Sequence, residues 1–90
     1  MARYIITYDL VNRKDYGPLI ERIKKYRKWA HPLESVWIVM TDDSATKIRD
    51  DLKNCLDNDD KVLVMKTTQG ASWSGLNNNV SEWIKNNPAS

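Results

Sequence analysis

Asp9 is the residue that the sequence places best for chemistry. It closes residues 3–10, a β-branched and aromatic run that predicts a buried strand, at the point where the strand should pass into a loop. A carboxylate at such a strand end can hold a divalent cation through its oxygens. Asp is also common there because its side chain accepts hydrogen bonds from nearby backbone amides, and the residues alone favour that structural role.

The composition limits the kinds of metal site that the chain can form. His31 and Cys55 are the single histidine and the single cysteine of the 90 residues, so a zinc site built from these residue types is excluded. A metal must therefore be bound by oxygen, which favours magnesium, manganese or calcium. Asp42 and Asp43 form another acidic pair, but a turn and a helix cap explain them. Cys55 has no internal disulfide partner, which fits a reducing cytosol.

Basic residues gather in the first third of the chain. Residues 1–31 hold eight Lys or Arg against three acidic residues, and residues 32–60 hold three against eight, although the net charge is only +2. A local patch is therefore the only part that could attract nucleic acid. Its alternative explanation is the solvated face of a helix. The patch consists of Arg22, Lys24, Lys25, Arg27 and Lys28.

Histidine and tryptophan add weaker candidates. A histidine can act as a general base near neutral pH, but His31, beside Pro32 at a predicted helix end, is better explained by capping or packing. Tryptophan can stack on bases. Trp37 and Trp83 fall on predicted apolar faces, so we expect Trp73, in a Ser- and Gly-rich stretch, to be the most exposed.

The spacing of apolar residues predicts the secondary structure. The expected strands are 3–10, a short segment near 32–35 that bends into a stronger strand at 36–41, and 61–67. The expected amphipathic helices are 17–29, which begins at Gly17-Pro18 and is stopped by His31-Pro32, and 45–56.

The sequence pattern changes after Thr68. We expect residues 69–76 to form a loop or a short edge strand. Three asparagines at 77–79 precede a last short helix, and Glu82 follows Asn79 at the spacing of a capping box.

The order of these elements predicts an α+β domain, namely a ferredoxin-like βαββαβ sandwich with an antiparallel sheet and an extra C-terminal helix. We expect residues 1–68 to form the core and residues 69–90 an extension of the same single domain. Both helices of such a fold cover one face of the sheet, so the strands should alternate apolar and polar residues. They are instead apolar on both sides, as Ile5 beside Tyr4 and Ile6 illustrates. We therefore expect a face-to-face homodimer that covers the second face.

No stretch approaches the roughly 18 apolar residues that a membrane helix requires. The first ten residues also lack the basic stretch and apolar core of a secretory signal. We expect a cytoplasmic protein.

Short motifs spread over residues 3–67 resemble the Cas2 family of CRISPR-associated proteins. The first strand ends Tyr8-Asp9-Leu10, Ser35-Val36-Trp37 opens the central strand, and Asp59-Asp60-Lys61-Val62 leads into the last strand. The related VapD-type toxin ribonucleases share this layout. The segment 31–37 is most similar to that of small, mostly uncharacterised bacterial Cas2-like proteins.

The resemblance implies a homodimer with facing sheets and a role for Asp9. In Cas2 nucleases the matching Asp of each copy approaches the dimer axis, and the pair holds Mg²⁺ or Mn²⁺ for phosphodiester hydrolysis. Arg13 and Lys14 match the basic residues that follow this Asp and would steer the phosphate. Lys24, Lys25 and Lys28 are further candidates for contact with RNA or DNA.

Two classes of function follow from these residues. The first is a dimeric, metal-dependent endonuclease acting on RNA or DNA. The second is a non-catalytic dimer that binds nucleic acid or protein, as a structural Cas2-like protein with a Cas1-like partner or as a component of a toxin–antitoxin pair. Several Cas2 proteins are structural dimers in which the Asp is dispensable, so the fold alone does not establish catalysis.

Overall fold

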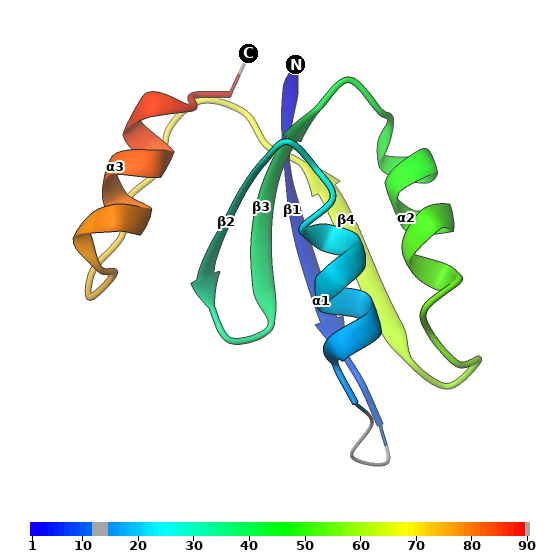
Figure 1. The fold of residues 1–90 in the computed structure, drawn as a ribbon. Helices are drawn as coiled ribbons and strands as arrows, with labels where there is room; N and C mark the ends of the chain where they lie inside the picture. Colours follow the sequence, from blue (N-terminus) through cyan, green and yellow to red (C-terminus); the bar gives the residue numbers. More distant parts are fainter. Residues whose placement is uncertain (12–14, 90) are drawn as a thin grey trace.

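Four strands form one antiparallel sheet in the computed structural model, which describes residues 1–11 and 15–89 (Figure 1). The elements are β1 (Ala2–Asp9), α1 (Gly17–Ile23), β2 (Lys28–Leu33), β3 (Val36–Thr41), α2 (Ala45–Lys53), β4 (Lys61–Lys66) and α3 (Asn78–Asn86). The strands lie in the order β2-β3-β1-β4, and each neighbouring pair is antiparallel. The expected α+β class and antiparallel sheet are confirmed.

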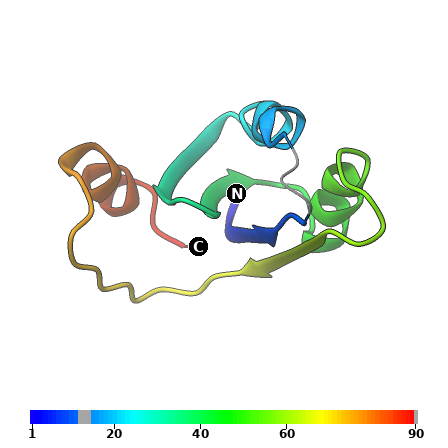
Figure 2. The same cartoon turned by 90° about the horizontal axis from the view of Figure 1, so that it is seen from below.

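The core lies between the sheet and the pair α1 and α2, which share one of its faces (Figure 2). Alternate residues of β1 and β3 point into it because side chains of a strand alternate between the two faces. The helices contribute residues spaced three or four apart, which lie on one side of each helix. The buried core residues are Tyr4, Ile6, Tyr8, Leu19, Ile23, Tyr26, Trp37, Val39, Ile48 and Leu52.

The first helix is shorter than the sequence predicts. The expected helix over 17–29 is wrong beyond Ile23, because the chain turns at Lys24 and is already in β2 at Lys28. Tyr26 is buried in the core, as a helix would also require, so the spacing of apolar residues does not distinguish the two structures. Pairing of Trp29 with Val39 of β3 supplies the backbone hydrogen bonds that a longer helix would have made internally.

The segment around Pro32 also differs from the expectation. His31 and Pro32 lie inside β2 and end no helix, and the short strand expected near 32–35 is wrong. Pro32 is tolerated because β2 is an edge strand, and the pairing with β3 shifts register between Ala30 and Leu33.

Helix α2 matches its predicted start and ends three residues early. Ser44 caps it by accepting a hydrogen bond from the Lys47 backbone N–H at 3.1 Å. Its last residue is Lys53, where 45–56 was expected, and the turn after it packs Cys55 and Leu56 against the core.

The C-terminal segment, residues 69–89, carries helix α3. Residues 69–76 form a loop without strand structure. Asn77, not Asn79, caps α3, and its side-chain oxygen accepts from the Val80 N–H at 2.9 Å, so the predicted capping box is wrong. None of the helices in the described ranges has the length and apolar character that crossing a membrane requires.

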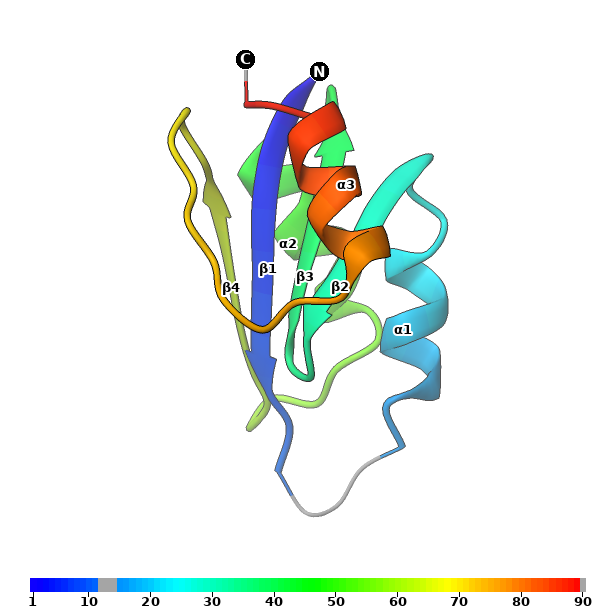
Figure 3. The same ribbon diagram turned by 90° about the vertical axis from the view of Figure 1, so that its left-hand side faces the viewer.

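The sheet face opposite α1 and α2 is called the open face below. Ile5 on this face pairs with Ile38 and Met65, and Thr7 pairs with Val36 and Leu63. Helix α3 and the loop before it lie in front of part of the open face (Figure 3). Leu63 and Met65 nevertheless remain 53% and 57% exposed. The second apolar face read from the strand alternation is therefore present, whereas the homodimer stays a prediction.

Candidate functional site

Asp9 is the last residue of β1, and its strand position places it on the open face with Ile5 and Thr7. It is exposed and lies opposite Lys61 in the pairing of β1 with β4. A shallow cavity of about 200 Å³ is lined by Asp9 together with Thr7 and Leu63. Among the described residues, Asp9 belongs to no cluster of three potential metal ligands. A metal at Asp9 therefore requires ligands from elsewhere.

An acidic cluster lies near the same end of the sheet, in the connection from α2 to β4. The carboxylate oxygens of Asp57, Asp59 and Asp60 lie within 4.8 Å of one another. Asp60 accepts hydrogen bonds from the backbone N–H groups of Val11 at 3.1 Å and Asp57 at 2.9 Å. These bonds join the loop before β4 to the segment that follows β1. Asp60 therefore has a structural role. The sequence signal for this cluster is the presence of three acidic residues within four positions.

The basic residues proposed for nucleic-acid contact fall into two groups. Arg13 and Lys14 lie outside the described residues. Lys24, Lys25 and Lys28 are exposed along the α1–β2 turn.

Arg22 does not belong to that exposed patch. Its guanidinium binds the carboxylate of Asp51 at 2.7 Å and lies over the Tyr26 ring, 5.0 Å from its centroid. It thereby joins α1 to α2. The pKa of Asp51 is lowered, first by the hydrogen bond from Lys47 and further by the charges of Lys47 and Arg22.

Trp29 is the most exposed tryptophan of the described chain, at 36% of its surface. The expectation that Trp73 would be the most exposed is wrong, because its indole is half-buried and donates to Ser81 Oγ at 3.0 Å. The Lys24 ammonium lies 5.6 Å from the Trp29 ring centroid. The α1–β2 turn therefore combines basic side chains with an exposed aromatic ring.

His31 packs, as the sequence favoured, although in a strand. Its ring stacks on Trp37 with the centroids 3.8 Å apart, and its Nε2 lies 2.9 Å from the Glu34 carbonyl oxygen. The Trp37 indole in turn donates to the Tyr8 hydroxyl at 3.0 Å, inside the core. The histidine is thus part of the packing around Trp37.

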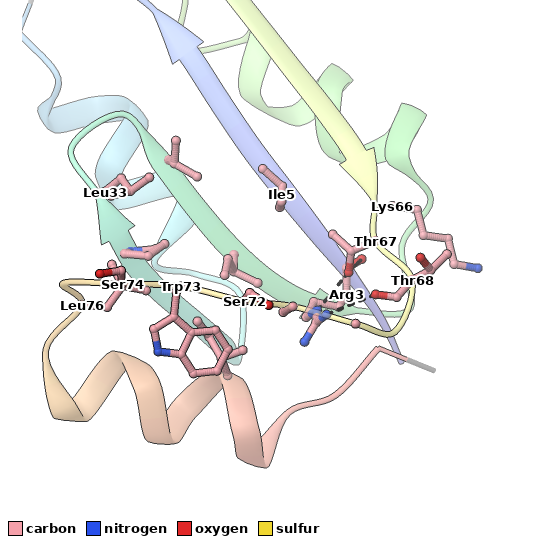
Figure 4. Close-up of a pocket in the computed structure, with 16 residues that line it drawn as sticks. Arg3, Ile5, Leu33, Lys66, Thr67, Thr68, Ser72, Trp73, Ser74 and Leu76 are labelled. Atoms are coloured by element: carbon pink, nitrogen blue, oxygen red, sulfur yellow. Dashed lines mark hydrogen bonds between the residues drawn. The ribbon is translucent and has the colours of Figure 1, made fainter.

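A larger cavity lies between the open face and the C-terminal segment (Figure 4). Its volume is about 650 Å³. Ile5 and Ile38 line it from the sheet, and Trp73 and Leu76 line it from the segment. An adjoining cavity of about 360 Å³ is lined in part by the same residues, including Arg3 and Trp73.

Arg3 is a buried charged residue that lines both cavities, and it is only 6% exposed. Its Nε donates to Thr67 Oγ1 at 2.9 Å, and its Nη atoms donate to the carbonyl oxygens of Asn87 at 3.2 Å and Thr68 at 3.3 Å. Arg3 thereby fastens both ends of the C-terminal segment to β1. In the sequence Arg3 resembles an ordinary strand residue, and the one signal of its role is a charge within an apolar run.

Comparisons of the chain with protein-family models, with curated proteins and with solved structures found no match.

Proposed function

We propose that this protein is a Cas2-like, dimeric, metal-dependent endonuclease that acts on phosphodiesters of RNA or DNA. The observation that carries the proposal is an exposed carboxylate, Asp9, at the end of a strand whose open face is apolar and partly uncovered. The element order and the strand order β2-β3-β1-β4 are compatible with a ferredoxin-like sandwich, which supports the proposal.

The uncovered part of the open face supports a dimer. Leu63 and Met65 project from β4 with more than half of their surface exposed, and Thr7 lies beside Leu63. A second copy that faces the first would remove this apolar surface from water. A two-fold axis through this region turns the single Asp9 of each chain into a pair.

A pair of carboxylates matches the chemistry of a hard divalent cation. Mg²⁺ and Mn²⁺ prefer oxygen ligands, and Asp9 offers one carboxylate from each copy. When bound, such an ion would polarise a phosphate and lower the pKa of a water molecule. Lys24, Lys25 and Lys28 would contribute positive charge that attracts the phosphate backbone.

The test of catalysis compares two single substitutions of exposed carboxylates. Labelled single- and double-stranded RNA and DNA are incubated with the full chain in Mg²⁺, in Mn²⁺ and in EDTA. We expect Asp9→Asn to reduce cleavage by at least roughly ten- to hundredfold, the range seen when support of a metal site is removed. Asp42→Asn is the matched control, because Asp42 is also exposed but follows Thr41, which pairs with Ala2 at the other end of β1. Cleavage that persists in EDTA or in Asp9→Asn contradicts the mechanism.

The test of the dimer uses sedimentation at micromolar concentration. We expect a dimer for the natural chain and a monomer for the double variant Leu63→Lys/Met65→Lys, because lysine ammonium groups resist burial in an apolar interface. Glu21→Lys reverses a charge on the exposed surface of α1 and should leave the dimer intact. A natural chain that sediments as a monomer removes the paired carboxylates from the proposal.

A non-catalytic nucleic-acid-binding dimer is the second candidate, favoured by three exposed lysines, of which Lys24 lies near the Trp29 ring. It predicts salt-dependent binding, because phosphate contacts release counterions. Reversing the charges of Lys24, Lys25 and Lys28 should abolish this binding, and Asp9→Asn should leave it unchanged. Binding without cleavage in the same set of variants selects this candidate over the nuclease.

A further inference from the structure

We propose that the cavity between the open face and the C-terminal segment binds a small amphipathic carboxylate, with its anionic group at Arg3 and its apolar body along the sheet. This site is separate from Asp9 and does not depend on the proposed nuclease activity.

The size and the walls of the cavity suit a small organic ligand. Its volume of about 650 Å³ falls within the range of known ligand sites, roughly 300–1,000 Å³. Ile5, Val36 and Ile38 line the cavity with apolar side chains from the sheet. Trp73 and Leu76 line it from the C-terminal segment, and Figure 4 labels them together with Ile5. A chain of methylene groups or a ring would bury its surface between these two walls.

The charge of Arg3 identifies the polar end of the ligand. The three acceptors of its hydrogen bonds, from Thr67, Thr68 and Asn87, are neutral oxygens. No Asp or Glu in the described ranges forms an ion pair with it, although it is only 6% exposed. A buried guanidinium without a negative partner is costly, so an anion that reaches it is strongly favoured.

The geometry of the guanidinium favours a carboxylate. Arginine carries five N–H donors, and the three hydrogen bonds of Arg3 leave one N–H on each Nη atom. Two neighbouring donors of this kind match the two oxygens of a carboxylate.

The surroundings of Arg3 have the same sign of charge. Lys66 lines the larger cavity and Lys85 lines the adjoining one, and within residues 1–11 and 15–89 no Asp or Glu lines either cavity. The Ser72 hydroxyl also lines the larger cavity and can donate a further hydrogen bond, whereas the Thr67 hydroxyl already donates to the Arg3 carbonyl oxygen at 3.2 Å. An anionic ligand therefore meets attraction there and no Asp or Glu among the described residues.

A second copy of the chain is the alternative occupant. The C-terminal segment already lies in front of this part of the open face (Figure 3), and the exposed Leu63 and Met65 are not among the residues that line the cavity. The proposed dimer contact and the ligand cavity therefore use different side chains of β4.

The experiment titrates the full chain with octanoate and, separately, with 1-octanol, an uncharged molecule with the same number of carbon atoms. Binding is followed by tryptophan fluorescence and by amide shifts in ¹H–¹⁵N spectra. We expect octanoate to bind roughly ten- to hundredfold more tightly than octanol, the usual effect of hydrogen bonds to a charged group. The largest shifts should fall at Ile5, Ile38 and Trp73.

Two substitutions locate the anionic group. Arg3→Gln should remove the preference for octanoate over octanol, and Lys66→Gln should reduce it less, because Lys66 is exposed and its attraction is screened by water. Lys53→Gln, an exposed lysine at the end of α2, is the control and should change nothing. If Arg3→Gln does not fold, the comparison of octanoate with octanol in the natural chain and in Lys66→Gln still decides the question.

Three results would overturn the proposal. The first is equal affinity for octanoate and octanol in the natural chain. The second is a set of shifts that maps away from the cavity. The third is octanoate binding that disappears as the protein concentration is raised and dimers form, since a second copy then fills the cavity.

Discussion

Two buried tyrosines of this protein should respond in opposite ways to the same substitution. The Tyr8 hydroxyl accepts a hydrogen bond of 3.0 Å from the Trp37 indole in the core. The Tyr26 hydroxyl is also buried, but it forms no hydrogen bond with the described residues. Replacing each tyrosine by phenylalanine removes one oxygen atom from an equally buried ring, since Tyr8 is 6% and Tyr26 8% exposed. The pair therefore measures what the hydrogen bond contributes.

The expected magnitudes follow from the partners left behind. Tyr8→Phe removes the acceptor of an indole N–H on a side chain that is only 1% exposed. Leaving such a donor unsatisfied lowers the free energy of unfolding by about 1–2 kcal/mol. For a domain of this size that lowers the melting temperature by about 4–16 °C. Tyr26→Phe leaves no donor behind, so its effect should lie between zero and about 1 kcal/mol of stabilisation.

Urea unfolding of both variants, followed by far-ultraviolet circular dichroism, measures these differences directly. The slope of free energy against urea should stay the same, because neither variant changes the surface exposed on unfolding. Equal destabilisation by the two substitutions would refute the reasoning, since it would mean that the loss arises from packing and not from the Trp37 hydrogen bond.

Two further predictions concern the helices. Because the pKa of Asp51 is lowered in the folded state, its stabilisation is complete above the usual carboxyl pKa, near 4, and is lost as the pH falls through the folded value. Asp51→Asn should therefore lower the urea midpoint at pH 7 and have no effect in strong acid, and an equal effect at both pH values would contradict this reasoning. Asn77→Ala removes the cap of α3 and should lower the free energy of unfolding by about 1 kcal/mol. Urea titrations of Asn77→Ala and of the control Asn78→Ala measure this difference. Equal losses of unfolding free energy in the two variants would contradict the assignment of the cap.

Much of the core fold could be predicted from the chain by itself. Local sequence signals identify β1, β3, β4 and α2. The strands contain runs of β-branched residues, and in α2 the cap Ser44 precedes apolar residues at helical spacing, Ile48 and Leu52. The two-sided apolar character of β1 and β3 was equally visible, because alternation along a strand assigns each residue to a face. The exposed position of Asp9 followed from its place at the end of the first strand.

The β2 strand could not be predicted, because its residues are compatible with two structures. Lys28 to Ala30 continue the spacing of the preceding helix, and the local sequence has no strong stop signal before His31. Pairing with β3 decides between a helix and a strand, because β3 supplies hydrogen-bond partners for the backbone groups of β2. These partners come from another part of the chain, so the local sequence does not reveal them.

The roles of Arg3 and the C-terminal segment likewise arise only from tertiary structure. Arg3 is separated by more than 60 positions from Thr67, Thr68 and Asn87, and no local pattern records that they meet. The chain alone determined which residues are apolar, charged or able to cap a helix, because these are properties of single residues and near neighbours. The tertiary structure decided which charged side chains are buried and which groups they contact. Burial and hydrogen bonding depend on groups that come together only when the chain folds.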